Sequence, residues 1–118
     1  MWTYTTYMLY TFLKGRNGGT FDTGPKKIDL DNFADFVFAK LWGEHAIVFH
    51  DSKSDLESDL KILAKLGLIN YENHLKAIRI NKEQMETLER IAHGMKTDPM
   101  RHRVPIINEY LTRIEAAV

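Results

Sequence analysis

The stretch SDLESDLKILAKLGLINYENHLKAIRIN, residues 54–81, constrains the fold of this chain more than any other. Its first part carries leucines at positions 56, 60, 63 and 66, which is the spacing of one buried side of a helix, and Gly67 supplies a helix stop. Two short runs follow, residues 68–71 and 76–80, separated by a polar tip in which Asn73 is suited to positive φ. We therefore expect a helix over residues 55–66 that leads directly into a β-hairpin.

The start of this helix is rich in acids and serines. Ser54 and Glu57 have the spacing of a capping box, in which each side chain binds a backbone N–H of the first turn. Asp55 and Asp59 lie near the same end, where a negative charge stabilises the helix dipole. We expect Asp55 and Asp59 on one flank of the exposed side and Glu57 on the other.

The rest of the pattern predicts a mainly α protein with a small antiparallel β-sheet, the α+β class. Apolar spacing and capping residues predict helices over residues 4–14, 31–42 and 105–117, and a further helix between Asn81 and Gly94, with Asp31 and Asn81 as N-caps. AIVF, residues 46–49, predicts a short strand, and the glycine-rich residues 15–29 predict one long loop. A chain of 118 residues fits one domain, here a core of residues 1–81 with a C-terminal helical extension over 82–118.

Composition narrows the classes of function. Lys and Arg number 16, as do Asp and Glu, whereas a dedicated nucleic-acid binder is usually basic, so any binding must come from a local patch. The absence of cysteine excludes disulfides, thiolate metal sites and cysteine catalysis. No apolar run approaches the roughly 18 residues that span a bilayer, and the first residues do not form a signal peptide. We expect a cytoplasmic protein without a membrane partner.

Two segments carry a resemblance to a known superfamily. DLKILAKLGLI at 59–69 and KAIRIN at 76–81 are similar to the part of the winged helix-turn-helix superfamily in which the recognition helix leads into the wing. The chain resembles that superfamily most clearly over residues 31–81, and the resemblance implies a winged helix that binds duplex DNA. GEHAIVFHDSK, residues 43–53, departs from it, because the usual turn between the two helices has three or four residues. A weaker similarity is to Panacea-type domains found beside toxin–antitoxin systems, which also place a strand in this gap.

The helix over residues 55–66 has a polar outer stripe. With Leu56 at 0° and about 100° per residue, Leu60 and Leu63 lie near 40° and 340° and define the buried side. The opposite side carries hydroxyl groups and lysines that could meet bases and phosphates of a duplex. An equally weighted alternative is a solvated surface. The residues of this outer stripe are Ser54, Ser58, Lys61 and Lys65.

Two further groups are candidates for phosphate contacts. Asn73, His74 and Lys76 lie at the hairpin tip, where a wing touches DNA in the superfamily; the alternative is an ordinary polar turn. The glycine-rich loop, which could wrap a phosphate backbone, is bracketed by Lys14, Arg16, Lys26 and Lys27. The fragment GTFDTGPK does not fit a phosphate-binding loop, because Pro25 stands where the lysine must be. Nucleotide hydrolysis is therefore rejected.

No catalytic or metal-binding set emerges from the sequence. The five histidines are scattered and show no metal-ligand spacing, so we expect surface histidines, no metal and no cofactor. We also expect that the protein is not an enzyme. The histidines lie at positions 45, 50, 74, 93 and 102.

The final predicted helix carries an apolar stripe made of Ile107, Tyr110, Leu111 and Ile114. The stripe either packs on its own domain or pairs with a second copy, and a helix after a complete small core slightly favours a homodimer. The leading hypothesis is a DNA-binding transcriptional regulator that acts as a homodimer. The alternative is a protein-interaction module with the same fold and no nucleic-acid binding, since a fold does not fix a function.

Overall fold

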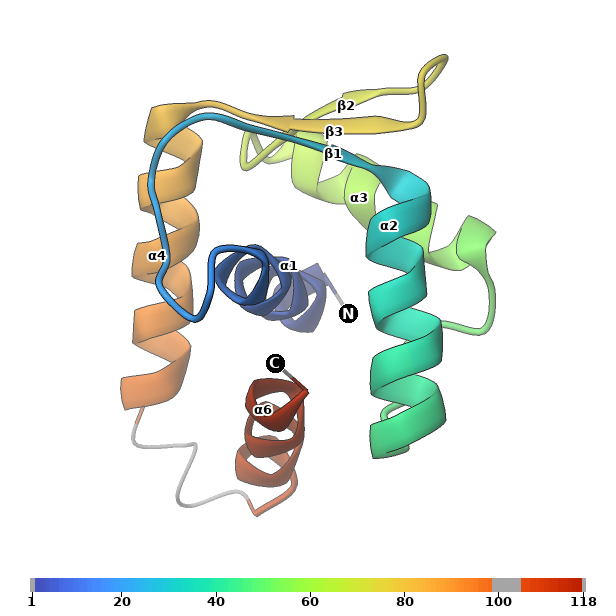
Figure 1. The fold of residues 1–118 in the computed structure, drawn as a ribbon, viewed down its shortest axis with the longest axis vertical. Coiled ribbons are helices and arrows are strands. Elements are labelled where there is room, and N and C mark those ends of the chain that lie inside the picture. Colours follow the sequence, from blue (N-terminus) through green and yellow to red (C-terminus); the bar gives the residue numbers. More distant parts are fainter. Residues whose placement is uncertain (1, 99–104, 118) are drawn as a thin grey trace.

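The computed structural model describes residues 2–98 and 105–117 of the chain. They form a group of helices with one small antiparallel sheet across one end, which is the α+β class predicted from the sequence (Figure 1). The elements in chain order are α1 (Trp2–Arg16), β1 (Lys26–Asp29), α2 (Leu30–Asp35), the π-helical segment η1 (Phe36–Glu44), α3 (Lys53–Lys65), β2 (Asn70–Glu72), β3 (Ala77–Ile80), α4 (Lys82–Thr97) and α6 (Pro105–Ala116).

Helix α1 lies at the centre of the molecule. Its side chains are buried over residues 5–9 and 11–13, nearly all the way round, because α3, α4 and α6 pack against it from different sides. A helix with so little exposed surface is the interior element of a fold. The threonines on it are accommodated by hydrogen bonds; Thr6, for example, donates to the carbonyl of Trp2 at 2.9 Å.

The sheet contains a strand that the sequence analysis assigned to a loop. Residues 26–29, the end of the predicted loop 15–29, form β1 and pair antiparallel with β3, giving the strand order β1-β3-β2. Ile28 lies opposite Ile78 in the register, and both side chains are buried. Local composition conceals this strand, because KKID has one apolar residue and its stability comes from pairing with a distant part of the chain.

The second helix is longer than predicted and begins one residue earlier. Asp29, not Asp31, occupies the N-cap position, and Asp31 instead forms an ion pair with Lys53 at the start of α3. The helix continues from α2 as η1, which has the wider i to i+5 hydrogen bonding of a π-helix and ends at Glu44.

Residues 46–49 do not form the predicted strand. Ala46 has a φ of 56°, which reverses the chain, and the N–H of Ile47 donates to the carbonyl of Leu41 at 2.9 Å. Ile47 is thereby buried against η1 without a partner strand. The strand on which the weaker similarity to Panacea-type domains depended is therefore absent from residues 45–52, which link η1 to α3.

The caps predicted for α3 and α4 have different outcomes. At α4 the prediction is confirmed, since Asn81 Oδ1 accepts from the N–H of Gln84 at 2.8 Å and Gln84 Oε1 accepts from the N–H of Asn81 at 2.9 Å. At α3 it is wrong: the cap is Ser52, whose hydroxyl accepts from the N–H of Asp55 at 3.2 Å, so the helix begins before Ser54. Helix α4 also runs past Gly94, to Thr97.

The C-terminal helices belong to the same core as the rest of the chain. Leu111 and Ile114 on α6 are fully buried and share one hydrophobic cluster with residues of α1, α3 and the sheet. Tyr110 packs edge-on against Phe49, with ring centroids 5.0 Å apart, and Ile107 is partly buried against the cluster. Of the two alternatives for this stripe, the structure shows packing on its own domain, and α4 and α6 are not an extension outside the core.

Within the described ranges, 2–98 and 105–117, no helix combines the length and the apolar composition that crossing a membrane requires.

Candidate nucleic-acid interface

The outer stripe of α3 lies where the helical spacing predicts it. Leu56, Leu60 and Leu63 are fully buried, and the opposite side of the helix is exposed. All four residues predicted to face a duplex are exposed: Ser54, Ser58, Lys61 and Lys65.

The four side chains differ in how free they are to bind. The hydroxyl of Ser58 donates its hydrogen to the carbonyl of Ser54 at 3.1 Å. Toward a binding partner this hydroxyl is therefore mainly a hydrogen-bond acceptor. Lys61 and Lys65 form no ion pair with any residue in the described part of the chain. Two free ammonium groups therefore lie one helical turn apart on the stripe.

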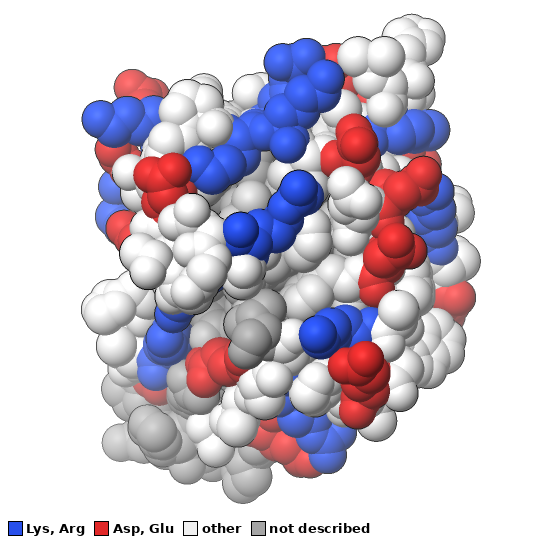
Figure 2. Space-filling view, in the orientation of Figure 1, with Lys and Arg blue, Asp and Glu red and all other residues white. Residues whose placement is uncertain are grey.

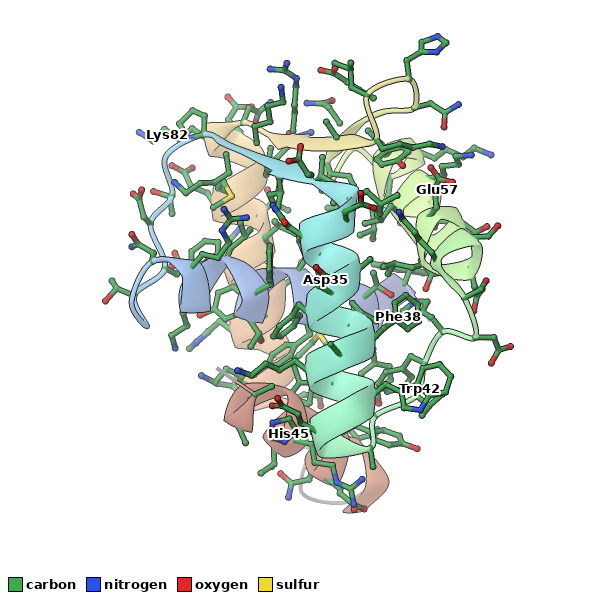
Figure 3. All side chains as sticks on the ribbon, turned by 45° about the vertical axis from the view of Figure 1, so that its right-hand side comes forward. Asp35, Phe38, Trp42, His45, Glu57 and Lys82 are labelled. Atoms are coloured by element: carbon green, nitrogen blue, oxygen red, sulfur yellow. The ribbon has the colours of Figure 1, made fainter. Side chains whose placement is uncertain are left out.

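Glu57 joins α3 to the hairpin instead of capping the helix. Its carboxylate accepts from the hydroxyl of Tyr71 on β2 and from the Nζ of Lys76 at 2.7 Å, and it lies below the hairpin in Figure 3. The hydrogen bond from Lys76, with that from Tyr71, holds the pKa of the Glu57 carboxyl below its ordinary value of 4.5. Burial, together with the hydrogen bond to Glu57, raises the pKa of Tyr71, so its hydroxyl remains protonated. The hairpin is thereby fixed to the helix by a charge-assisted contact.

The hairpin tip is exposed at Asn73, His74 and Lys76, as expected for a wing. Lys76, and not Asn73, has the positive φ, of 49°. Its ammonium group is engaged by Glu57 and also lies 3.3 Å from Asn73 Oδ1, so it is not free to meet a phosphate without leaving Glu57. Leu75 at the tip is 61% exposed.

Lys26 and Lys27 are separated from the other predicted contacts. They lie on β1, at the edge of the sheet farther from β2, whereas α3 packs beside β2. Lys26 is half-buried and pairs with Asp22 at 2.8 Å. Lys27 is exposed and lies opposite Arg79 in the register, and Arg79 pairs with Glu72. The structure thus unites the α3 stripe with the hairpin tip but not with the lysines of β1.

The visible face of the molecule carries both signs of charge. Figure 2 shows Lys and Arg side chains over the strands and acidic side chains over α2. The acids on α2 and just before it are Asp29, Asp31 and Asp35, all exposed. This face is a mosaic, which agrees with the net charge of zero and leaves α3 and the hairpin as the basis for any nucleic-acid contact.

Comparison with known proteins adds no constraint: no protein-family model, curated protein or solved structure matches the chain.

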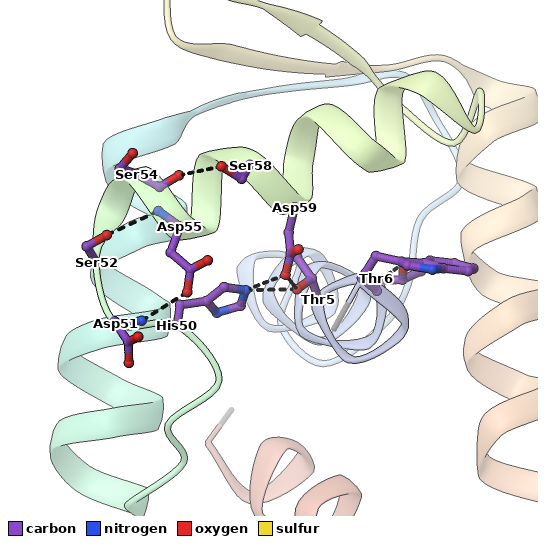
Figure 4. Close-up of polar contacts among 10 residues, drawn as sticks. Thr5, Thr6, His50, Asp51, Ser52, Ser54, Asp55, Ser58 and Asp59 are labelled. Carbon is purple, nitrogen blue, oxygen red and sulfur yellow. Dashed lines mark hydrogen bonds and ion pairs between the residues drawn. The ribbon is translucent and has the colours of Figure 1, made fainter.

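Behind the stripe lies a buried polar cluster of Thr5, His50 and Asp59, which the sequence analysis missed (Figure 4). His50 Nε2 is 2.7 Å from Asp59 Oδ2, and the hydroxyl of Thr5 donates to the same oxygen at 2.9 Å. A carboxylate oxygen can only accept, so Nε2 carries the proton. The cluster connects α1, the 45–52 segment and α3, and it fixes α3 against the central helix.

Two sequence predictions are corrected by this cluster. His50 is 2% exposed and is not a surface histidine, and Asp59 is buried instead of lying on an exposed flank. A signal for Asp59 was present, because at about 100° per residue it lies near 300°, beside Leu63 near 340°. For His50 there was none, since its burial depends on the reversal at Ala46. His102 lies outside the described residues.

The remaining histidines lie apart from one another. His74 and His93 are exposed and His45 is half-buried. In the described part of the chain no group of three or more His, Cys, Asp or Glu side chains is placed to hold a metal ion.

Proposed function

We propose that the chain binds duplex DNA through α3 and the β2–β3 hairpin. The observation that carries the proposal is the pair Lys61 and Lys65, exposed, free of ion pairs with described residues, and aligned with Ser54 and Ser58 on one side of the helix. Lysines contact phosphates and set the position of the helix on the duplex, while hydroxyls at the helix start come nearest to the bases.

The arrangement of elements supports the same proposal. The hairpin follows α3 directly, which is the place of the wing in the superfamily that the sequence resembles, and β1 completes a three-stranded sheet beside it. Glu57 holds the hairpin against α3, so the helix and the tip would approach a duplex together. In this proposal the protein is a cytoplasmic transcriptional regulator.

The test is fluorescence anisotropy with mixed-sequence duplexes at about 50 mM and about 200 mM salt. The double variant Lys61→Met/Lys65→Met should bind more weakly and lower the slope of log K against log salt by about 2, because two phosphates are no longer neutralised. Lys40→Met is the matched control, since Lys40 is exposed on η1, away from α3. Folded wild-type protein that binds no duplex at low salt overturns the proposal.

A protein-interaction module is the second candidate, and one observation favours it. Trp42 on η1 is 41% exposed and lies against Phe38, with ring centroids 6.0 Å apart, and both point to the same side of η1 in Figure 3. Val48, on the segment after η1, is 50% exposed. Exposed aromatic side chains are typical of protein contacts.

A second copy of the chain is the partner to test first. Leu111 and Ile114 are already buried within one chain, so a homodimer would have to use another surface, and Phe38 and Trp42 offer one. Sedimentation velocity over a range of protein concentrations should show a dimer that Trp42→Ala weakens and Trp2→Ala, the control for another exposed tryptophan, does not. A monomer at all concentrations excludes this form of the second candidate.

A further inference from the structure

Two adjoining hollows lie on the side of the molecule formed by α1, α4 and α6. The first, of about 460 Å³, is bounded by α1 and the turn after it, the end of α4, and Glu115 on α6. The second, of about 560 Å³, runs along α4, and the two share Tyr10 and Lys96. Small-molecule sites in proteins have volumes of this order. Nothing in the candidate nucleic-acid interface uses these residues.

Glycines keep both hollows open. Gly18 and Gly19, in the turn after α1, have φ values of 71° and 96°, so side chains there would be strained, and a Cβ on either would point into open space. Gly94 lies inside the last turn of α4, which continues to Thr97, and glycine is unfavourable within a helix. A Cβ on Gly94 would also meet nothing within 4 Å, so this residue leaves the second hollow unfilled.

The walls combine flat aromatic surface with hydrogen-bonding groups. Tyr7 and Tyr10 line the first hollow, and Tyr10 is held from behind by Phe21, with ring centroids 4.6 Å apart. Burial, with smaller contributions from Glu89 and Glu115, raises the pKa of Tyr10, so its hydroxyl stays protonated and can donate.

The charges favour an anion. Lys14 and Lys96 line the first hollow, where the facing carboxylate of Glu115 already accepts from the hydroxyl of Tyr7. The second hollow adds Arg90 and Glu89, so the three always-charged cations of the groove exceed its two carboxylates. Lys14 and Lys96 form no ion pair with a described residue, and both are half-buried. A ligand carboxylate or phosphate between them would supply the missing counter-charge.

We propose that this groove binds a small organic anion with a flat apolar body. The body would lie against the partly exposed Tyr10, and the anionic group would lie between the ammonium groups of Lys14 and Lys96.

Titration of the full chain by two-dimensional amide NMR tests the proposal with three probes that share one ring: benzoate, phenyl phosphate and benzyl alcohol. At least one anion should give saturable shifts at Gly15, Gly18, Gly94 and their neighbours, with an affinity at least tenfold above that of neutral benzyl alcohol. Saturation by neither anion, or equal binding of the neutral probe, overturns the proposal.

Two variants connect the binding to the groove. Gly94→Leu should fill the second hollow and abolish or weaken binding at least fivefold while the melting temperature stays equal or rises, because leucine is the better helix former. Lys96→Met should lower the affinity for the anions at least fivefold and leave the affinity for benzyl alcohol unchanged. Lys40→Met, on η1 and outside both hollows, is the matched control and should bind the anions as wild type does. Unchanged anion binding in both groove variants overturns the assignment.

Discussion

His50 Nε2 lies 2.7 Å from Asp59 Oδ2 inside the protein, and the two side chains come from the segment before α3 and from α3 itself. Thr5 on the central helix donates to the same carboxylate oxygen. A buried carboxylate is tolerated only when its hydrogen bonds are made. The relationship between His50 and Asp59 therefore sets where α3 lies, and with it where the outer stripe points.

Removal of the Asp59 carboxylate should destabilise the fold. Asp59→Ala breaks the hydrogen bonds with His50 and Thr5, and we expect the free energy of unfolding to fall by about 2–3 kcal/mol. Urea unfolding followed by circular dichroism measures the change. Asp51→Ala, which removes an exposed carboxylate nearby, should change it by less than about 0.5 kcal/mol. Equal stabilities of the two variants would contradict the role given to the cluster.

Acid should weaken the junction between α3 and the hairpin through Glu57. Its pKa is lowered in the folded state, so its contribution to stability is complete above its ordinary value of 4.5 and is lost as the pH falls through the lowered value. We expect the stability difference between wild type and Glu57→Gln to be largest near neutral pH and to shrink as the pH drops below 4.5. Unfolding curves over this pH range measure the stability difference directly. A difference that does not depend on pH would contradict the role given to the Glu57 carboxylate.

The same substitution should strengthen DNA binding if α3 and the hairpin form the interface. Glu57→Gln releases the ammonium group of Lys76 and removes a carboxylate from the junction, so the affinity should rise about threefold to tenfold and the salt slope should increase by about 1. Glu44→Gln, an exposed carboxylate at the end of η1, removes the same charge elsewhere and serves as control. Anisotropy titrations of the three proteins compare them; an equal gain in both variants would indicate a net-charge effect alone.

Shortening Leu111 should test the packing of α6 on its own chain. Leu111→Ala leaves a cavity in the cluster and should cost about 2–5 kcal/mol. The loss should be the same at all protein concentrations, because the contacts lie within one chain. Thermal melts over a range of protein concentrations measure it, with the exposed Glu109→Ala as control. A stability that rises with concentration in the wild type and not in Leu111→Ala would instead place Leu111 at an interface.

Local patterns predicted the helices well and the connections poorly. The buried leucines of α3 and the N-cap at Asn81 could be predicted because they depend on neighbours three or four residues away. Strand β1 was not readable, because Lys26 and Lys27 gain their extended conformation from pairing with β3. AIVF at 46–49 had strand composition, but the positive φ of Ala46 turns the chain back onto η1.

The same distinction between local patterns and distant contacts applies to the candidate site. The outer stripe of α3 followed from helical spacing, and its four residues, Ser54, Ser58, Lys61 and Lys65, are exposed as that spacing predicts. The partners of Glu57 and Asp59 lie 9 to 54 residues away, beyond the reach of helical spacing. Sequence reasoning could thus predict which side chains are exposed on the helix, but not that Glu57 neutralises Lys76.

The central place of α1 has a consequence for how the chain acquires its structure. Helix α1 is the first element in the sequence, yet the surfaces that cover it come from α3, α4 and α6, as far along as residue 114. During synthesis part of its surface must remain uncovered until the residues of α6 have been made, with Tyr7 and Leu9 open to non-native association. Folding is then a late, all-or-none event with contacts between distant parts of the chain, and a fragment that stops after β3 lacks two of the three helices that close around α1.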